Sequence, residues 1–175
     1  MVRRRVGTSL YAGFLFTILG LVSWASGQPF VFPSLGPSAF ILAFDRRGER
    51  TRTYRIVGSH LIGGVAGLAA YSLLAAGGSI TTTPAAFSPD GLRLAASGVL
   101  SIVLTSWGMI ATDTNHAPAC ATTLIVSLGL LSTPIQVAII LVSVVILVEV
   151  HAGVLYIFEW LVGDTHPVYK DDQTT

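Results

Sequence analysis

Long apolar runs fill most of this chain, and short polar or proline-rich stretches separate them. Four of the runs contain no proline and extend to the roughly 20 residues that cross a bilayer as a helix. They cover residues 8–26, 56–76, 92–111 and 135–160. The pattern therefore predicts four uninterrupted transmembrane helices.

Two further apolar stretches are broken by proline. Residues 28–44 carry three prolines in their first ten positions, the last of them Pro37. Proline lacks a backbone donor and disfavours helix in the residue before it, so only the part after Pro37 is expected to be helical. Residues 112–131 repeat this pattern around Pro118. About eight extended residues plus about nine helical ones reach roughly 40 Å, so each stretch is predicted to cross as extended chain followed by a half-helix.

The composition agrees with a membrane protein. Of the 175 residues, 52% are apolar and 11% are charged, and the mean hydropathy is +0.72. These values lie outside the range of soluble globular domains. We expect an all-α fold of six transmembrane segments forming a single domain over residues 1–175, with residues 161–175 as a polar tail.

The basic residues predict how the chain is oriented. Residues 45–55 contain five of the ten Lys and Arg residues, and three more lie at positions 3–5. Loops rich in Lys and Arg stay on the cytoplasmic side. Six crossings then place both termini and nine of the ten basic residues in the cytoplasm. A surface for nucleic acid or another anionic partner is the less favoured interpretation of the loop.

The chain divides at about residue 90 into two halves of similar arrangement. Residues 8–90 and 91–160 each contain a full helix, a proline-broken segment and another full helix. Three crossings per half invert the second half relative to the first. Interrupted segments at corresponding positions of two inverted halves indicate a transporter's binding site, because irregular backbone persists in a bilayer only beside protein or a water-filled cavity.

Both predicted half-helices begin near the middle of the membrane, with their N-termini facing each other. A helix N-terminus carries about half a positive charge and unpaired N–H groups, which favours an anion. The residues around the two starts are small or hydroxyl-bearing. The candidate substrate-binding residues are Gly36, Ser38, Ala39, His116, Ala119, Cys120 and Thr122. The alternative is that the prolines and small residues serve only kinking and packing.

Few ionisable residues lie within the apolar segments, where a charge is costly and usually faces a partner or cavity. Glu149 interrupts the most apolar run, and His116 precedes Pro118. We expect both to be candidates for proton coupling, with a protonated Glu149 bonded to a neighbouring helix as the structural alternative. His60 is expected to be an interhelical hydrogen bonder. Close to it, Gly63 and Gly67 predict a close helix contact.

No catalytic or metal-ligand spacing occurs in the chain. The single cysteine, Cys120, forms neither an intramolecular disulfide nor a metal-binding pair. Neither a His-Glu-x-x-His nor a Gly-x-Ser-x-Gly motif is present. We therefore expect no enzyme activity, no metal and no cofactor. An intramembrane enzyme using Asp113, His116 and Glu149 stays as an alternative, and so does a structural or regulatory membrane subunit.

Three stretches carry a family resemblance: HAPACATTLIVSLG, FPSLGPSA and RIVGSHLIGGVAG. With them, about residues 10–160 resemble the HPP family of small bacterial, archaeal and plastid membrane proteins. The His-Pro-Pro motif would begin at His116, with Ala117 in place of the first proline and Pro118 retained. Cys120 stands where the usual motif has glycine.

Members of that family have been associated with nitrite transport in cyanobacteria and plastids. The resemblance therefore implies a permease for a small inorganic anion, with nitrite as the expected substrate, in a prokaryotic cytoplasmic membrane. It brings no enzyme activity and no cofactor. The expected partners are the anion and the lipid bilayer. Whether the chain also pairs with a second copy of itself is left open. The sequence does not separate a channel from a coupled transporter.

Overall fold

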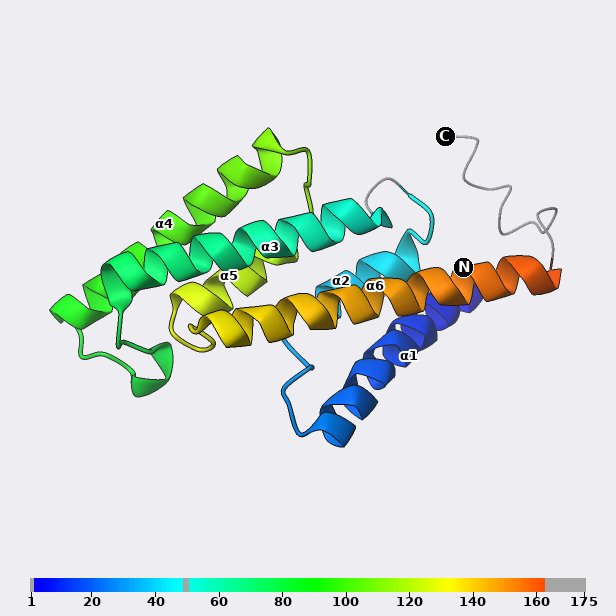
Figure 1. The fold of residues 1–175 in the computed structure, drawn as a ribbon, viewed down its shortest axis with the longest axis horizontal. Coiled ribbons are helices and arrows are strands. Elements are labelled where there is room, and N and C mark those ends of the chain that lie inside the picture. Colours follow the sequence, from blue (N-terminus) through cyan, green and yellow to red (C-terminus); the bar gives the residue numbers. More distant parts are fainter. Residues whose placement is uncertain (1, 49–50, 163–175) are drawn as a thin grey trace.

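The structure is a computed structural model that describes residues 2–48 and 51–162, and within these residues it contains helices and no strand. Figure 1 shows six α-helices joined by short connections. Their bounds are α1 Val2–Ser26, α2 Leu35–Phe44, α3 Thr53–Ala70, α4 Pro89–Ala111, α5 Ala119–Ser127 and α6 Pro134–Val162. One π-helical turn, Tyr71–Ala75, continues α3.

Four of these helices are long and apolar enough to cross a membrane. They are Arg5–Ser26, Thr53–Ala75, Pro89–Ala111 and Pro134–Val162. The four uninterrupted helices expected from the sequence are thus confirmed, and the chain is an integral membrane protein. The expected tail of residues 161–175 lies outside the described residues from residue 163 onward.

The other two helices are short and follow the prolines. Helix α5 has nine residues and begins directly after Pro118, as predicted. Helix α2 has ten residues and begins at Leu35, three residues earlier than predicted. Pro37 therefore lies inside its first turn, where a helix tolerates proline because the first N–H groups have no partner within the helix.

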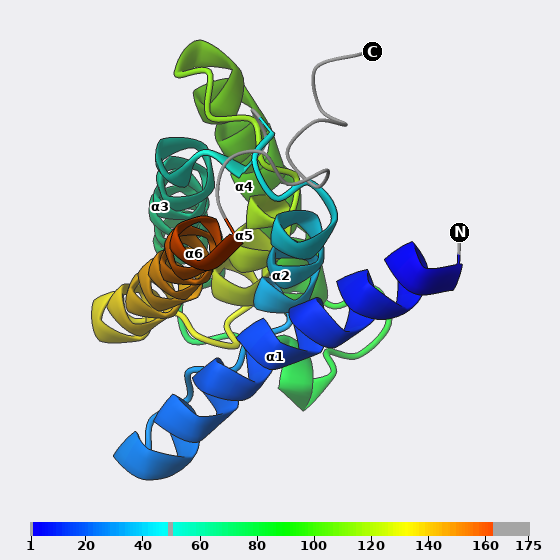
Figure 2. The same ribbon diagram turned by 90° about the vertical axis from the view of Figure 1, so that its right-hand side faces the viewer.

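Helix α3 is the centre of the arrangement, because it packs against α4, α5 and α6. Helix α2 contacts α1 and α6. Figure 1 shows that α2 and α5 start close together and run in opposite directions, and Figure 2 shows α1 crossing the outside of this group at an angle. The two short helices thus lie between long helices.

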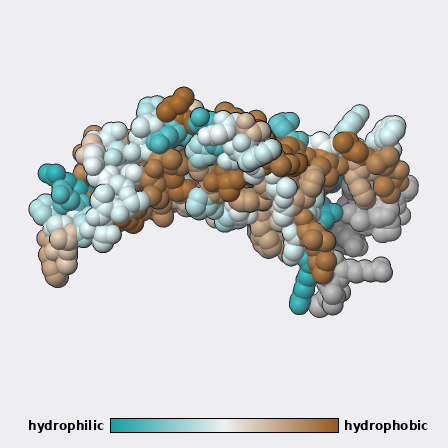
Figure 3. Space-filling view, turned by 90° about the horizontal axis from the view of Figure 1, so that it is seen from below, coloured by the Kyte–Doolittle hydropathy of each residue, from teal (hydrophilic) through white to brown (hydrophobic). Residues whose placement is uncertain are grey.

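The apolar core lies between α1, α2, α5 and α6. Its largest fully buried side chains include Leu15, Leu19, Leu35, Leu42, Ile140 and Leu147. Large apolar side chains are also abundant on the outside, among them Leu10, Val99 and Trp107, each about 70% exposed. Figure 3 shows brown, hydrophobic surface along one face of the molecule. A surface of this kind suits contact with lipid rather than with water.

The close contact predicted for the small residues of α3 is confirmed, and its partner is α5. A Cβ atom at Gly63 would lie 2.8 Å from the carbonyl oxygen of Ala119. A Cβ atom at Gly67 would lie 2.8 Å from the carbonyl oxygen of Thr123. Both neighbours are backbone atoms, which move only with the whole helix. The order of the contacts also shows that α3 and α5 run in the same direction.

We predict that Gly67→Ala lowers the free energy of unfolding by about 1–3 kcal/mol, because the added methyl group overpacks the α3–α5 contact. Thermal melting of the purified protein in detergent measures the change. Gly20→Ala is the matched control, since a Cβ atom on that glycine of α1 meets no atom within 4 Å. Equal melting temperatures for the two variants would contradict the prediction.

Candidate functional site

A buried histidine bridges the two short helices. His60 lies on α3 with none of its surface exposed. Its Nε2 atom lies 3.2 Å from the hydroxyl of Ser38 in the first turn of α2. Its Nδ1 atom lies 2.7 Å from the hydroxyl of Thr122 in the first turn of α5. One imidazole therefore holds the starts of α2 and α5 together.

A second histidine joins the same group. Nε2 of His116 lies 3.0 Å from the hydroxyl of Ser38, and the rings of His116 and His60 are 5.5 Å apart between centroids. His116 is 3% exposed. We call Ser38, His60, His116 and Thr122 the histidine–hydroxyl cluster. It confirms the expectation that His60 hydrogen-bonds between helices.

The positions of the hydrogen atoms in the cluster follow from its acceptors. The Ser38 hydroxyl lies 3.2 Å from the carbonyl oxygen of Ser34, which can only accept. When Ser38 donates there, it accepts from the Nε2–H groups of both imidazoles. Nδ1 of His60 then carries no hydrogen and accepts from the hydroxyl of Thr122. This assignment satisfies every bond in the cluster with both rings neutral.

The same assignment leaves one acceptor open. Nδ1 of His116 carries no hydrogen in this arrangement, and no described residue donates to it. A proton can therefore bind to His116 at Nδ1 without breaking a bond of the cluster. Protonation of His60 at Nδ1 would instead break its bond with the donating hydroxyl of Thr122. His116 is thus the member of the cluster that is suited to exchange a proton.

Two buried hydroxyl groups next to the cluster have no partner. The Oγ atoms of Ser34 and Ser59 are fully buried and make no hydrogen bond within the described residues. Ser34 directly precedes α2. Ser59 precedes His60 on α3, next to Gly58, whose Cβ position contacts Thr114 in the connection before α5. A buried hydroxyl without a partner costs about 1–3 kcal/mol, which a bound ligand or water would offset.

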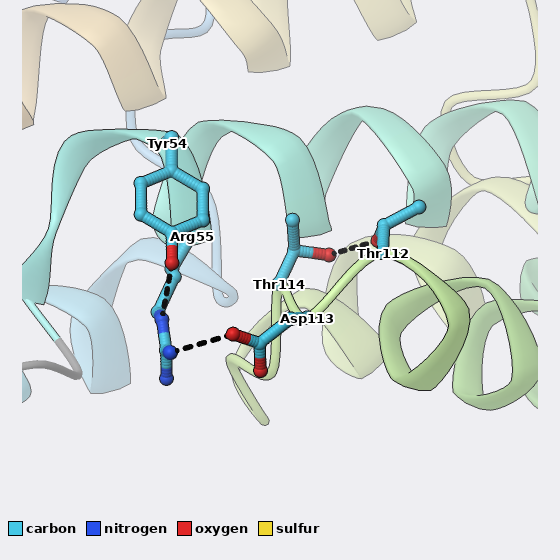
Figure 4. Close-up of polar contacts among 5 residues, drawn as sticks. All are labelled: Tyr54, Arg55, Thr112, Asp113 and Thr114. Carbon is cyan, nitrogen blue, oxygen red and sulfur yellow. Dashed lines mark hydrogen bonds and ion pairs between the residues drawn. The ribbon is translucent and has the colours of Figure 1, made fainter.

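An ion pair holds the segment that presents His116. Arg55, at the start of α3, donates from Nη2 to Oδ2 of Asp113 at 2.9 Å. The hydroxyl groups of Thr112 and Thr114 lie 2.8 Å apart in the same segment (Figure 4). Asp113 and Thr114 lie just before His116 in the chain. These contacts therefore fix the connection from α4 to α5.

The remaining predicted residues lie around the cluster rather than in it. Ala39 and Ala119 are fully buried beside the two helix starts. Cys120 is partly buried, and its amide donates to the carbonyl of Ala117. A Cβ atom at Gly36 would meet nothing within 4 Å, so no close backbone approach requires glycine there. The structure thus brings together Ser38, His116 and Thr122 of the predicted set.

Sequence reasoning gave His60 no place in the binding site, although the structure puts it at the centre. A signal for it was present: Gly63, Gly64 and Gly67 follow His60 at the spacings of one helix face. A glycine face of this kind contacts another helix closely, and the histidine shares that face.

Glu149 lies apart from the cluster. It is on an exposed face of α6, and it makes no hydrogen bond with any described residue. The structural alternative in the sequence analysis was a hydrogen bond from Glu149 to a neighbouring helix. No such bond occurs among the described residues. Its neighbours Val148 and His151 line a pocket together with Arg46 and Arg47 of the loop between α2 and α3. Glu149 thus lies level with that loop.

Comparison with known proteins agrees with the motif. The family model for the HPP transmembrane region matches residues 2–165. The chain belongs to this family. In this HPP family member, the two positions that depart from the motif, Ala117 and Cys120, are joined by a 3.0 Å backbone hydrogen bond, so the turn before α5 is intact. No curated protein and no solved structure matches the chain.

No group of three or more metal-ligating side chains occurs within the residues that the structure describes. The cluster contains two imidazoles and two hydroxyl groups and no carboxylate or thiolate. The groups that the cluster offers are therefore hydrogen-bonding ones.

We predict that Thr122→Val lowers the free energy of unfolding by about 1–3 kcal/mol, because Nδ1 of the buried His60 loses its donor. Chemical denaturation in detergent measures the change. Thr17→Val is the control, since the hydroxyl of Thr17 is exposed and bonds only the carbonyl of Gly13 in its own helix. A loss of stability that is no larger for Thr122→Val than for the control would contradict the assigned bond.

Proposed function

We propose that this protein moves a small monovalent anion across the membrane, with nitrite as the first candidate, through a site at the histidine–hydroxyl cluster. The observation that carries the proposal is the buried hydrogen-bonded contact between the starts of α2 and α5 through Ser38, His60 and Thr122. Both helices point their positive ends toward this contact, which favours an anion without a charged side chain in the membrane.

In this proposal α1–α3 and α4–α6 form two inverted repeats. The chain before α2 and before α5 completes a crossing in each repeat, as extended backbone followed by a short helix. The opposite directions of α2 and α5 in Figure 1 support this arrangement. So does the contact of each short helix with the long helix before it in the chain, α1 for α2 and α4 for α5.

Side chains rather than amides are the proposed anion ligands. The amides of Ala119, Cys120 and Ala121 donate to the carbonyls of residues 116–118, so these donors at the start of α5 are already used. The hydroxyls of Ser38 and Thr122 can rotate toward an anion. The unpartnered hydroxyls of Ser34, one turn before Ser38, and of Ser59, next to His60 in the chain, would add two donors.

A structural or regulatory subunit without transport is the second candidate. It is favoured by the close packing of the cluster, whose four side chains are between 0% and 3% exposed. In the transport proposal the same packing represents an occluded state that opens when α2 and α5 separate. Anion flux distinguishes the two candidates.

We predict that proteoliposomes containing the purified protein take up nitrite, and that Ser38→Ala reduces the rate by about 10- to 100-fold, because the anion loses a hydrogen bond. Ser143→Ala is the matched control. Its hydroxyl is also buried but bonds only the carbonyl of Ile139 within α6. The transport proposal fails if the wild-type protein moves neither nitrite nor other small anions, with or without a pH gradient.

We further predict that the dependence of flux on pH is lost in His116→Gln and retained in Glu149→Gln. His116 has an open acceptor beside the proposed anion site, whereas Glu149 lies on the outer face of α6. Nitrite uptake measured across a series of pH values, at equal amounts of protein in the membrane, tests this. If Glu149→Gln lost the pH response and His116→Gln kept it, the proton pathway would lie on α6 and the role of His116 would be contradicted.

A further inference from the structure

A row of buried hydroxyl groups runs along α4 where it meets α5. Ser97, Ser101 and Thr105 are each fully buried and stand four residues apart, so their side chains share one face of α4. The hydroxyl of Thr105 lies 2.8 Å from that of Thr123 on α5. Ser97 donates to the carbonyl oxygen of Ser127 at 2.8 Å. We call these five residues the hydroxyl row.

One hydroxyl group of the row has no partner. The Oγ atom of Ser127 is fully buried and makes no hydrogen bond within the described residues. Ser127 stands one turn after Thr123, so both side chains lie on the α5 face that meets α4. Ser101 stands between the two bonded pairs, and its hydroxyl donates to the carbonyl oxygen of Gly98 within α4. Ser101 and Ser127 therefore offer two hydroxyl groups that can turn toward a molecule between the helices.

The row begins beside the histidine–hydroxyl cluster and leads away from it. Thr123 directly follows Thr122 of the cluster in the chain. From Thr105 to Ser97 the row runs toward the start of α4, away from Asp113, which follows its end. These eight residues cover about 12 Å along the helix, and half of the hydrocarbon core measures about 15 Å. The row is therefore long enough to join a site in the middle of the membrane to one surface.

The equivalent contact in the first half of the chain is apolar. In the proposed repeats α1 and α2 correspond to α4 and α5. The buried side chains described on α1 are Leu15 and Leu19, and α2 adds Leu35 and Leu42 to the same apolar core. A polar route that starts at the cluster therefore fits the contact between α4 and α5 better than the contact between α1 and α2.

The far end of the row lies next to the π-helical turn after α3, which contacts both α4 and α5. The hydroxyl of Tyr71, in this turn, donates to the carbonyl oxygen of Gly78 at 3.0 Å. The amide of Ile80 donates to the carbonyl oxygen of Leu128, which follows Ser127. The connection from α3 to α4 is thus bonded to the end of α5. Single π-helical turns of this kind are frequent at functional sites.

We propose that the hydroxyl row is the route of the anion between the cluster and the membrane surface at the start of α4, with Ser101 and Ser127 as a second binding position. This inference rests on the proposed anion transport. Hydroxyl groups donate to an anion and carry no charge, which would be costly inside the membrane. Packing between helices explains the bonded pairs of the row but not the unpartnered hydroxyl of Ser127. An anion beside Ser127 would offset the cost of that group.

The test uses the full chain purified in detergent and compares its melting temperature in sodium nitrite and in sodium gluconate, a salt of a much bulkier anion. An anion that binds the folded protein raises its melting temperature. We expect nitrite to do so for the wild type. Ser127→Ala and Ser101→Ala should each weaken the apparent affinity for nitrite about tenfold, because the anion loses a hydrogen bond.

Ser143→Ala is the matched control, since its hydroxyl is also buried and bonds the carbonyl of Ile139 within α6. It should respond to nitrite as the wild type does. Ser101→Ala removes no bond between helices, so it tests the row even if Ser127→Ala unfolds.

The inference is overturned if nitrite raises the melting temperatures of Ser127→Ala and Ser101→Ala as much as that of Ser143→Ala. A shift of Ser127→Ala that is equal in both salts would also overturn it: an upward shift indicates an empty site, and a downward shift indicates a bound water only. Ser38→Ala separates the two proposals. A nitrite response lost in Ser38→Ala but kept in both row variants rejects the row and leaves the cluster as the anion site, whereas no response in the wild type rejects both.

Discussion

The hydrogen bonds of one buried histidine set the relative position of three helices. A fully buried imidazole must find partners for both nitrogens, because an unsatisfied polar group in an apolar interior is costly. His60 finds them on two segments, Ser38 of α2 and Thr122 of α5. The starts of the two short helices are therefore tied to one depth along α3. A change in the depth of either start would leave a nitrogen of His60 without its partner.

The glycine face of α3 makes this geometry accessible. Gly63 and Gly67 bring the backbone of α5 into contact with α3, and His60 lies one turn before Gly63. Without that close approach, the side chain of His60 would not reach Thr122. A second contact, between Gly108 of α4 and Ile62 of α3, brings α4 close as well. Thr105 and Thr123 then bond between α4 and α5 at 2.8 Å.

The irregular backbone before α2 and before α5 is buried on one side only, since Val31, Pro33, Asn115 and Ala117 are exposed. In a membrane each unsatisfied backbone group costs several kcal/mol, so non-helical chain must be covered. Phe32 and Ser34 before α2, and Thr114 and His116 before α5, are all less than 10% exposed. Thr53 lines a pocket together with Arg46, Arg47 and Arg52 and precedes His60 by seven residues, about 10 Å along α3, so this pocket and the cluster lie at different depths.

Features that depend on local chain chemistry could be predicted from the sequence. Four helices follow from the length of the apolar runs, and the start of α5 follows from Pro118, which lacks a backbone donor. The start of α2 does not follow in this way, because α2 begins before Pro37. Ser38, His116 and Thr122 could be selected because they stand at those two starts. The family motif at His116 is likewise local, and it is confirmed by the match over residues 2–165.

Three features came only from the tertiary structure: the central role of His60, the exposure of Glu149 and the open space at Gly36. Each depends on how a helix is rotated about its axis, and packing against distant segments sets that rotation. His60 bonds residues 22 and 62 positions away, and Ser38 bonds a residue 78 positions away. The sequence by itself determined which stretches form helices and which polar residues are scarce. Only the tertiary structure decided which of those residues meet, because in a helix every side chain faces outward and its neighbours belong to other helices.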